Sequence, residues 1–443
     1  MERTLLSELH AHLGKEVFVQ GSILVRRDHG KLVFFDIHDR SGEVQAVILP
    51  SHEGVAESAA MVKEQWVVEM KGIVNKRPDK MVVASQANGD IELEITHLHV
   101  LGSARELPFD ANAELNLDTL FDTRPLTLRR PRERAIFKVQ HEIIRAYREF
   151  LTAEGFTEFM APKIVGGDAE GGGNVFKLEY FKGQDAFLAT SPQLYKQIMV
   201  GVFERVFAIG NVFRAEKHST SRHLNEYTSL DIEMGFIKSH EDIMRLETKL
   251  MHHIIAHLKT TCADAFATLG ATFPKAPETF PVMKLKEAQA LIKEKTGRDT
   301  LDEPDLNPED ERWLCEYANE HLDSDYVFVT HYPISKRPFY THEDKEDPGY
   351  TKSFDLLFRG VEITTGGQRI HVYDEYIEKL KAKKLDPALF EFYLQAFKYG
   401  MPPHGGWGMG LERLTQKFLG LSNAKEATLF PRDMNRIDTL LSS

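Results

Sequence analysis

Two hydrophobic periodicities divide the chain. Over roughly the first hundred residues, apolar and polar positions often alternate in five short runs, at 17–21, 32–36, 44–49, 66–74 and 91–95, with turn-forming residues between them. Alternation with many β-branched residues predicts strands. One alanine-rich run, 56–63, predicts a helix. Five strands and one short helix favour a small closed barrel of the five-stranded OB type over residues 1–103.

The periodicity becomes helical after residue 130. Apolar residues recur at spacings of three and four from Ile136 to Leu151, and Gly155 is expected to end this helix. Strand-like and helical runs then alternate to the C-terminus without an internal repeat, which predicts one large α+β domain over residues 131–443. The segment between the two parts, residues 104–130, is rich in proline, aspartate and asparagine and is predicted to form an irregular hinge.

Composition narrows the class of protein without identifying it. The chain has 443 residues, of which 42% are hydrophobic and 28% charged, as in ordinary globular proteins. The formal net charge of -12 argues against a protein that coats nucleic acid indiscriminately, although a local basic surface remains compatible with it. No apolar run is long enough to span a membrane, and the first residues lack a secretory or transit pattern, so a cytoplasmic protein is expected.

Two groups of metal-ligating residue types are expected to have no catalytic role. His252, His253 and His257 lack the glutamate of an HExxH motif and any nearby cysteine, so they are predicted to be ordinary helical residues. Cys262 and Cys315 are too few for a disulfide framework and are predicted to be packed thiols.

The densest group of charged residues follows a predicted strand that ends at Phe213. A polar loop comes next, and a second strand returns through residue 231. The candidate ligand-binding residues of this hairpin are Arg214, Glu216, Arg222, His223, Tyr227 and Asp231. Arginines can clamp phosphate groups and an aromatic ring can stack on a base. A solvated charged hairpin is the alternative.

Two carboxylates flank the turn signal Arg359-Gly360. A turn centred on residues 358 and 359 places Asp355 directly opposite Glu362, whereas a turn centred on 359 and 360 makes them diagonal neighbours. Both registers put them on the same face of a strand pair. Paired carboxylates among apolar strand residues suit a hard cation such as Mg²⁺, and pairing with an arginine or lysine is the alternative.

The segment 399–414 is rich in glycine, which lets a ligand approach the backbone closely. A helix is predicted to begin near Gly410, with Arg413 in its first turn. A tight turn with packing glycines is the alternative.

The segment 190–197 contains a helix start. Ser191 is predicted to be the N-cap and Pro192 the first helical residue, so Gln193 and Lys196 share one face of the helix. Without the other segments, a surface helix with a solvated lysine would be the default interpretation.

These segments, in this order, resemble the class II aminoacyl-tRNA synthetases, and more narrowly the aspartyl-tRNA synthetases of the archaeal type. Residues 150–162 resemble motif 1, a dimer-forming helix and strand that ends in proline. The hairpin after Phe213 resembles motif 2, and residues 408–413 resemble motif 3. The resemblance covers essentially the whole chain. It implies an anticodon-binding OB barrel, a hinge, and an antiparallel-sheet catalytic domain in a homodimer that uses ATP, Mg²⁺, L-aspartate and tRNA-Asp, with tRNA-Asn as a further candidate.

The resemblance also implies roles for single residues. The catalytic pair would be Arg214, at the α-phosphate, and Arg413, over the adenine and at the γ-phosphate. The other ATP contacts would be Glu216, Arg222, His223, Tyr227, Glu362 and Gly410. The Mg²⁺ ligands would be Asp355, Glu362 and Thr365. The aspartate contacts would be Glu170, Ser191, Gln193, Lys196, Asp231 and Arg369. The anticodon contacts would be Phe34, Gln45 and Glu92.

Two rival functions are compatible with the same motifs. Asparaginyl-tRNA synthetases share them, but a cation at Lys196 favours a carboxylate substrate over an amide. A non-catalytic tRNA-binding paralogue would not need the arginines and carboxylates of the motifs. The sequence therefore predicts ATP-dependent ligation of L-aspartate to tRNA-Asp through an aspartyl-adenylate, and leaves open whether tRNA-Asn is charged as well.

Overall fold

The computed structural model describes residues 2–30, 32–84, 86–110, 113–167, 174–218 and 220–441. The chain folds into two compact units, residues 1–113 and 114–443. A search of the described residues finds no helix with the length and apolar character needed to cross a membrane.

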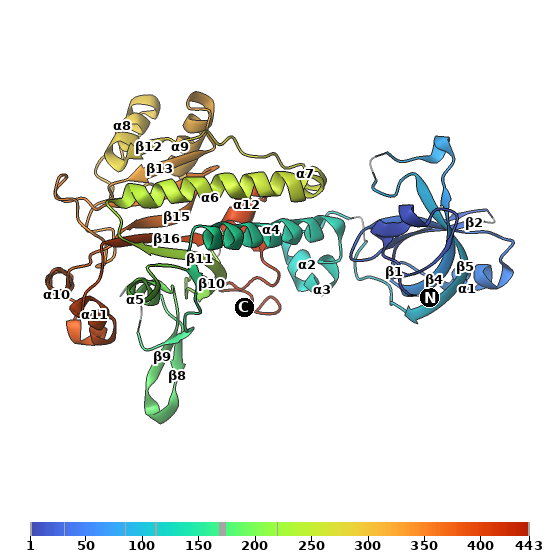
Figure 1. Cartoon of the computed structure of the whole chain (residues 1–443), viewed down its shortest axis with the longest axis horizontal. Helices are drawn as coiled ribbons and strands as arrows, with labels where there is room; N and C mark the ends of the chain where they lie inside the picture. The colour runs from blue at the N-terminus through green and yellow to red at the C-terminus, as the bar shows by residue number, and fades with distance from the viewer. Residues whose placement is uncertain are drawn as a thin grey trace. The chain divides into compact units, whose positions relative to one another are not determined.

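The first unit is a closed barrel with the strand order β1-β2-β3-β5-β4 (Figure 1). Its elements are η1 (Leu6–His12), β1 (Glu16–His29), β2 (Leu32–His38), β3 (Glu43–Ile48), α1 (Glu53–Met61), β4 (Val67–Lys76), η2 (Asp79–Met81) and β5 (Ile91–Gly102). Alternate strand residues such as Phe35, Ile37, Ala46 and Leu93 are fully buried inside it, as a period of two requires. The five-stranded OB-type barrel predicted from the sequence is confirmed.

The second unit is built on an eight-stranded sheet with the order β12-β13-β14-β15-β16-β11-β10-β6. These strands are β6 (Thr157–Glu158), β10 (Arg205–Phe213), β11 (Glu226–Gly235), β12 (Val282–Lys284), β13 (Tyr326–Thr330), β14 (Ser353–Phe358), β15 (Val361–Gln368) and β16 (His404–Gly410). The two outer pairs, β12 with β13 and β6 with β10, are parallel, and the pairs between them are antiparallel. A small sheet contains β7 (Ile164–Val165), β9 (Asp185–Leu188) and β8 (Lys177–Glu179).

Helices α4 (Pro131–Ala153) and α6 (His240–Thr261) cover one face of the large sheet (Figure 1). The other helices of this unit are α2 (Leu117–Asp122), α3 (Arg124–Thr127), α5 (Gln193–Phe203), α7 (Ala263–Leu269), α8 (Leu285–Thr296), α9 (Pro308–His321), α10 (Tyr373–Ala382), α11 (Glu391–Lys398) and α12 (Leu411–Leu419), with the short turns η3 (Phe181–Gly183), η4 (Pro387–Phe390) and η5 (Ala424–Ala427). The α+β class predicted from the sequence is confirmed.

Strand parity decides which side chains face away from α4 and α6. Phe354, Leu356 and Phe358 of β14 belong to the core under these helices. Leu357 instead packs with residues of α8 and α9. Asp355 shares the face of Leu357, because residues two apart in a strand point the same way. The part of this face that α8 and α9 leave uncovered holds the functional cavity.

The segment 104–130 differs from its prediction in the second half, where α2 and α3 form. The Asn116 side chain caps α2 by accepting a hydrogen bond from the Thr119 amide. Arg124 is buried and donates to three backbone carbonyls, those of Leu429, Glu426 and Thr428. Such contacts, about three hundred residues away in sequence, are not visible in local turn composition.

Candidate active site

The hairpin of β10 and β11 positions the charged residues predicted after Phe213. The two strands pair in register, with Val212 opposite Tyr227 and Ala208 opposite Asp231. The Arg214 guanidinium carbon lies 5.8 Å from the centre of the Tyr227 ring. Glu216 forms an ion pair with Arg214 at 3.9 Å, and its Oε2 lies 3.4 Å from His223 Nε2. The predicted hairpin therefore exists, and its arginine and aromatic side chains lie close together.

The hairpin of β14 and β15 turns at Arg359-Gly360, so the diagonal register is the one observed of the two that the sequence left open for Asp355 and Glu362. Leu357 pairs with Glu362 and Asp355 pairs with Thr365, with a bulge between these pairs. In a regular strand, residues three apart face opposite sides of the sheet. The bulge adds one residue to β15, so Glu362 and Thr365 face the same side. The Thr365 hydroxyl donates to Glu362 Oε1 at 2.8 Å.

Asp355 is buried and Glu362 half-buried, and the two carboxylates influence each other. Burial raises the pKa of Asp355 to about 6, helped by the charge of Glu362 and opposed by Arg337. Burial also acts to raise the pKa of Glu362, but Arg413 and the Thr365 hydroxyl outweigh it and hold that pKa below its ordinary value. Arg337 pairs with Asp355 Oδ2 at 2.8 Å. The pairing with an arginine, left open by the sequence, thus occurs at Asp355.

The donor set nevertheless fits a divalent cation. Asp355 Oδ1 is buried and has no hydrogen-bond partner among the described residues. Glu362 supplies a second carboxylate and Thr365 a hydroxyl oxygen on the same face. The described residues contain no cluster of three or more histidine, cysteine or acidic side chains that could hold a metal. Mg²⁺ typically binds one or two carboxylates together with substrate phosphates, so two carboxylates suffice.

Strand β16 and helix α12 close the opposite wall. Helix α12 begins at Leu411 with Gly410 as its N-cap, as predicted, and Arg413 lies in its first turn. Arg413 Nη1 donates to the Glu362 carbonyl at 3.2 Å. A side chain at Gly406 would place its Cβ 2.0 Å from the Ile232 carbonyl oxygen. Glycine is therefore required there to let β16 lie against β11.

Helix α5 presents Gln193 and Lys196 on a buried face. The helix begins at Gln193, later than predicted, with Pro192 as the N-cap. The Ser191 hydroxyl still accepts a hydrogen bond from the Gln193 amide at 3.1 Å. The N-cap predicted at Ser191 is therefore one residue too early, although its hydroxyl still binds an amide at the start of the helix.

Lys196, Asp231, Glu233 and Arg369 form a buried chain of alternating charges. Lys196 Nζ lies 2.9 Å from Asp231 Oδ1 and 3.5 Å from Glu233 Oε2, and Arg369 Nε lies 2.9 Å from Glu233 Oε1. All four side chains are at most 6% exposed. Burying each charge is costly, and mutual pairing offsets that cost. Removing one member therefore leaves an uncompensated charge in the interior.

These elements enclose one cavity of about 470 Å³. The predicted residues that line it are Ser191, Gln193, Arg214, Glu216, Arg222, His223, Tyr227, Asp231, Asp355, Glu362, Thr365, Arg369, Gly410 and Arg413. Lys196 is buried and reaches the cavity through its partner Asp231. Glu170 lies outside the described residues. A cavity of this size accommodates a nucleotide or a comparable ligand.

Three residues were missed by sequence reasoning: Glu233, Arg337 and Glu311. Glu233 continues the alternation Tyr227, Ser229, Asp231 along β11, so strand periodicity could have identified it. Arg337 pairs with Asp355, and Glu311 pairs with Arg222 at 2.6 Å. No local motif marks either residue, because each partner comes from a distant part of the chain.

The predicted anticodon residues lie on the outer face of the barrel. Gln45 Oε1 accepts from Arg77 at 3.0 Å, and Gln45 Nε2 donates to Glu92 at 3.4 Å. Phe34 is half-buried and shares this outer face, because Phe35 and its cross-strand partner Ala46 point inward. Phe34 makes an edge contact with His29 at 5.8 Å. The three residues therefore share one surface.

The three histidines lie on α6, the helix predicted for them. His252 contacts the Pro277 carbonyl and His257 pairs with Glu142. Both cysteines are buried and free.

Comparison with known proteins identifies the family. Residues 116–434 match the family described as tRNA synthetases class II (D, K and N), and residues 17–101 match the OB-fold nucleic acid binding domain. The chain belongs to the class II tRNA synthetases. It is therefore an aminoacyl-tRNA ligase, and the cavity lined by the segments that resemble motifs 2 and 3 is the candidate active site of this enzyme class.

Similarity extends over the whole synthetase. The chain is 47% identical to the aspartate–tRNA(Asp/Asn) ligase of Thermus thermophilus, over 98% of this chain and 99% of that one. It is 39% identical to the aspartate–tRNA(Asp) ligase of Pyrococcus abyssi, over 96% of both. Among solved structures, it is similar to the asparaginyl-tRNA synthetase of Pyrococcus horikoshii bound to asparaginyl-adenylate, with a TM-score of 0.91, 31% identity, and coverage of 99% of both chains.

Proposed function

We propose that this synthetase ligates L-aspartate to tRNA-Asp, and also to tRNA-Asn, through an aspartyl-adenylate. The observation that carries the amino-acid assignment is full-length identity of 47% and 46% to relatives named aspartate–tRNA(Asp/Asn) ligase, in Thermus thermophilus and Deinococcus radiodurans. Similarity to an asparaginyl-tRNA synthetase is lower, at 31%. The same two relatives support charging of both tRNAs.

The cavity supports adenylate formation by positioning and charge. The α-carboxylate of aspartate is already anionic, so it can attack the α-phosphorus of ATP without a general base, and pyrophosphate leaves. Arg214 and Arg413 line the cavity and would neutralise charge on the phosphates. Positioning and electrostatic stabilisation account for most catalysis of this kind. In the second step, a terminal ribose hydroxyl of the tRNA attacks the adenylate carbonyl, and AMP leaves.

Mg²⁺ would be held by Glu362 and Asp355 with the Thr365 hydroxyl. When bound, the ion supplies positive charge against the phosphate oxygens. In the protein alone, the positive charge of Arg337 balances the negative charge of the Asp355 carboxylate, and Arg413 balances Glu362. The protein residues alone thus keep the two carboxylates in place on one sheet face.

The amino-acid side chain would be read by charge. Arg369 and Asp231 line the cavity, and Lys196 stabilises Asp231 from behind. Aspartate and asparagine have nearly the same shape, so charge rather than shape must separate them. We expect Ser191 and Gln193 to complete this part of the site.

We also propose a homodimer. Helix α4 and β6 correspond to the dimer-forming motif, and Met160 next to β6 is 79% exposed. Such interfaces are isologous and large. Light scattering at micromolar concentration should give twice the chain mass, and a monomeric mass would contradict the dimer.

The function is tested by ATP–pyrophosphate exchange followed by tRNA charging. Exchange should depend on aspartate and should not occur with asparagine. Purified tRNA-Asp and tRNA-Asn should then both accept aspartate. Robust exchange with asparagine would contradict the amino-acid assignment, and charging of tRNA-Asp alone would contradict only the proposal of dual tRNA use.

A further inference from the structure

Helix α9 packs tightly against the tip of the β14–β15 hairpin. Gly360, at this tip, has a φ of +84°, which disfavours any side chain. A Cβ there would also lie 3.0 Å from Arg312 Cγ of α9. Cys315, one turn after Glu311, is almost completely buried on the same helix. The first turn of α9 is therefore held against the strands that carry Glu362.

Glu311 lies in this first turn and connects two parts of the cavity. Its Oε2 accepts a hydrogen bond from Arg222 Nη2 at 2.6 Å and from the Glu362 amide at 3.4 Å. Arg222 Nη2 also donates to the Gly360 carbonyl at 3.1 Å. The Glu311 side chain is only 12% exposed. The Glu311 carboxylate thus joins the loop that carries Arg222 to the backbone of the β14–β15 hairpin.

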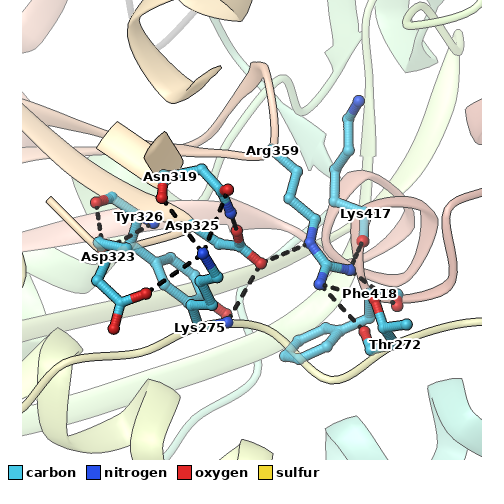
Figure 2. Close-up of polar contacts among 10 residues, drawn as sticks. Thr272, Lys275, Asn319, Asp323, Asp325, Tyr326, Arg359, Lys417 and Phe418 are labelled. Carbon is cyan, nitrogen blue, oxygen red and sulfur yellow. Dashed lines mark hydrogen bonds and ion pairs between the residues drawn. The ribbon is translucent and has the colours of Figure 1, made fainter. Parts of the chain in front are cut away.

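The other side of the hairpin tip is anchored independently by Arg359. Figure 2 shows its guanidinium between the Asp325 carboxylate, at 2.8 Å, and the Lys417 carbonyl at the end of α12, at 3.1 Å. The same guanidinium donates to the Thr272 carbonyl. The tip is therefore fixed relative to α12, the helix that carries Arg413. The hairpin tip that Arg222 contacts is therefore held in place by the protein itself, without a bound ligand.

The geometry leaves part of the Arg222 guanidinium available. Among the described residues, both side-chain hydrogen bonds of Arg222 are donated by Nη2. A guanidinium has five N–H donors in a rigid plane, so fixing Nη2 also fixes the directions of Nη1 and Nε. Arg222 lines the cavity. Its remaining donors can therefore meet an anionic ligand in a preset orientation.

We propose that Glu311 is a positioning residue that holds Arg222 in the orientation in which it binds the outer phosphates of ATP. This inference rests on the proposed adenylation function for the identity of the ligand. Neutralisation of one arginine by Glu311 weakens the general attraction for phosphate. A fixed orientation, however, removes the entropic cost of ordering a long side chain when ATP binds. We expect this gain to exceed the loss of attraction, because several other cations in the cavity still attract the phosphates.

The test compares Glu311→Ala and Glu311→Gln with Glu316→Ala, an exposed glutamate on the same helix. Loss of a charge-assisted hydrogen bond predicts that Glu311→Ala raises the KM for ATP in pyrophosphate exchange by about tenfold to a hundredfold. The KM for aspartate should stay within about twofold of wild type. Glu311→Gln keeps an acceptor, so it should recover part of the ATP affinity. Glu316→Ala should behave as wild type.

A double variant separates positioning from a purely structural role. If Glu311 acts through Arg222, then Arg222→Ala should raise the KM for ATP, and adding Glu311→Ala should raise it little further. Additive effects, or an unchanged KM for ATP in both Glu311 variants, would overturn the proposal. If Glu311→Ala does not fold, Glu311→Gln and the double variant with Gln give the same comparison.

ATP binding without amino acid, measured by calorimetry on the full-length protein, keeps the two proposals distinct. If wild type binds ATP but activates no aspartate, the proposed function fails, and a weaker ATP affinity of Glu311→Ala still supports the positioning role. If wild type activates aspartate and the Glu311 variants bind ATP like wild type, only the positioning role fails.

Discussion

The outer face of the barrel and the catalytic cavity use polar residues in opposite ways. On the barrel, Phe34, Gln45 and Glu92 are half-buried on regular strands and contact near neighbours on the same face. In the cavity, several charged residues are buried and paired with partners far away in sequence, such as Arg369 with Glu233. A half-exposed site can change without disturbing the fold. A buried charge network cannot, because each member balances another.

The cores of the two units also differ in the polar and ionisable side chains that they bury. The barrel core consists of apolar side chains, with Asn88 as a buried polar exception that bonds to the Leu6 and Glu43 carbonyls. The catalytic core contains Glu247 of α6, whose pKa burial raises to about 8. The Thr364 side chain opposes this rise only in part. The catalytic unit therefore holds a carboxylate with unfavourable electrostatics in its core.

The largest effect is expected for Lys196→Leu, which breaks the buried charge chain. Asp231 and Glu233 would lose their shared cation, so aspartate-dependent exchange should fall by about a thousandfold or more. ATP binding should survive through Arg214 and Arg413. Exchange assays with aspartate and calorimetry with ATP measure the two effects.

The matched control for that variant is Lys249→Leu, an exposed lysine of α6. It should leave both measurements unchanged. Normal aspartate exchange by Lys196→Leu would show that the charge chain does not serve the amino-acid pocket.

The next effect concerns pH and Glu247. Because its folded-state pKa is raised from 4.5 to about 8, the folded state binds this proton more tightly than the unfolded state does. The stabilising contribution is therefore fully present below about 4.5 and is lost as pH rises towards 8. Glu247→Gln should remove this pH-dependent loss of stability. At pH 8 it should stabilise the catalytic unit by roughly 2–4 kcal/mol relative to wild type.

Chemical denaturation at several pH values between 6 and 8 measures this effect. The two units should be followed with separate probes, because a two-domain protein need not unfold in one step. The barrel transition should be the same in wild type and Glu247→Gln. Equal pH dependence of the catalytic unit in both proteins would contradict the protonated state of Glu247.

The smallest effect is expected for Phe34→Ala on the barrel. Loss of one base-stacking ring should weaken tRNA charging by about 1–3 kcal/mol. Aspartate-dependent exchange should be almost unchanged, because no residue of the cavity is touched. Leu101→Ala, at an exposed apolar position of β5, provides the control. An equal loss in both assays would contradict the division of labour between the two units.

The sequence by itself determined the barrel, the α+β catalytic unit and about half of the residues that line the cavity. These features depend on periods of two and 3.6 residues and on local signals such as the Arg359-Gly360 turn and the Gly410 helix start. The resemblance to a known family then assigned roles to single residues. Local patterns also placed Asp355 and Glu362 on one face, although the register stayed open.

Only the tertiary structure decided which charges balance each other. The sequence pattern does not encode the bulge that brings Thr365 beside Glu362. It also does not encode two contacts between separate segments, Arg337 with Asp355 and Glu311 with Arg222. The same holds for Lys196, which the structure buries behind Asp231. The physical reason is that the pairing of a buried charge depends on distances in space, which are set when the whole sheet has assembled.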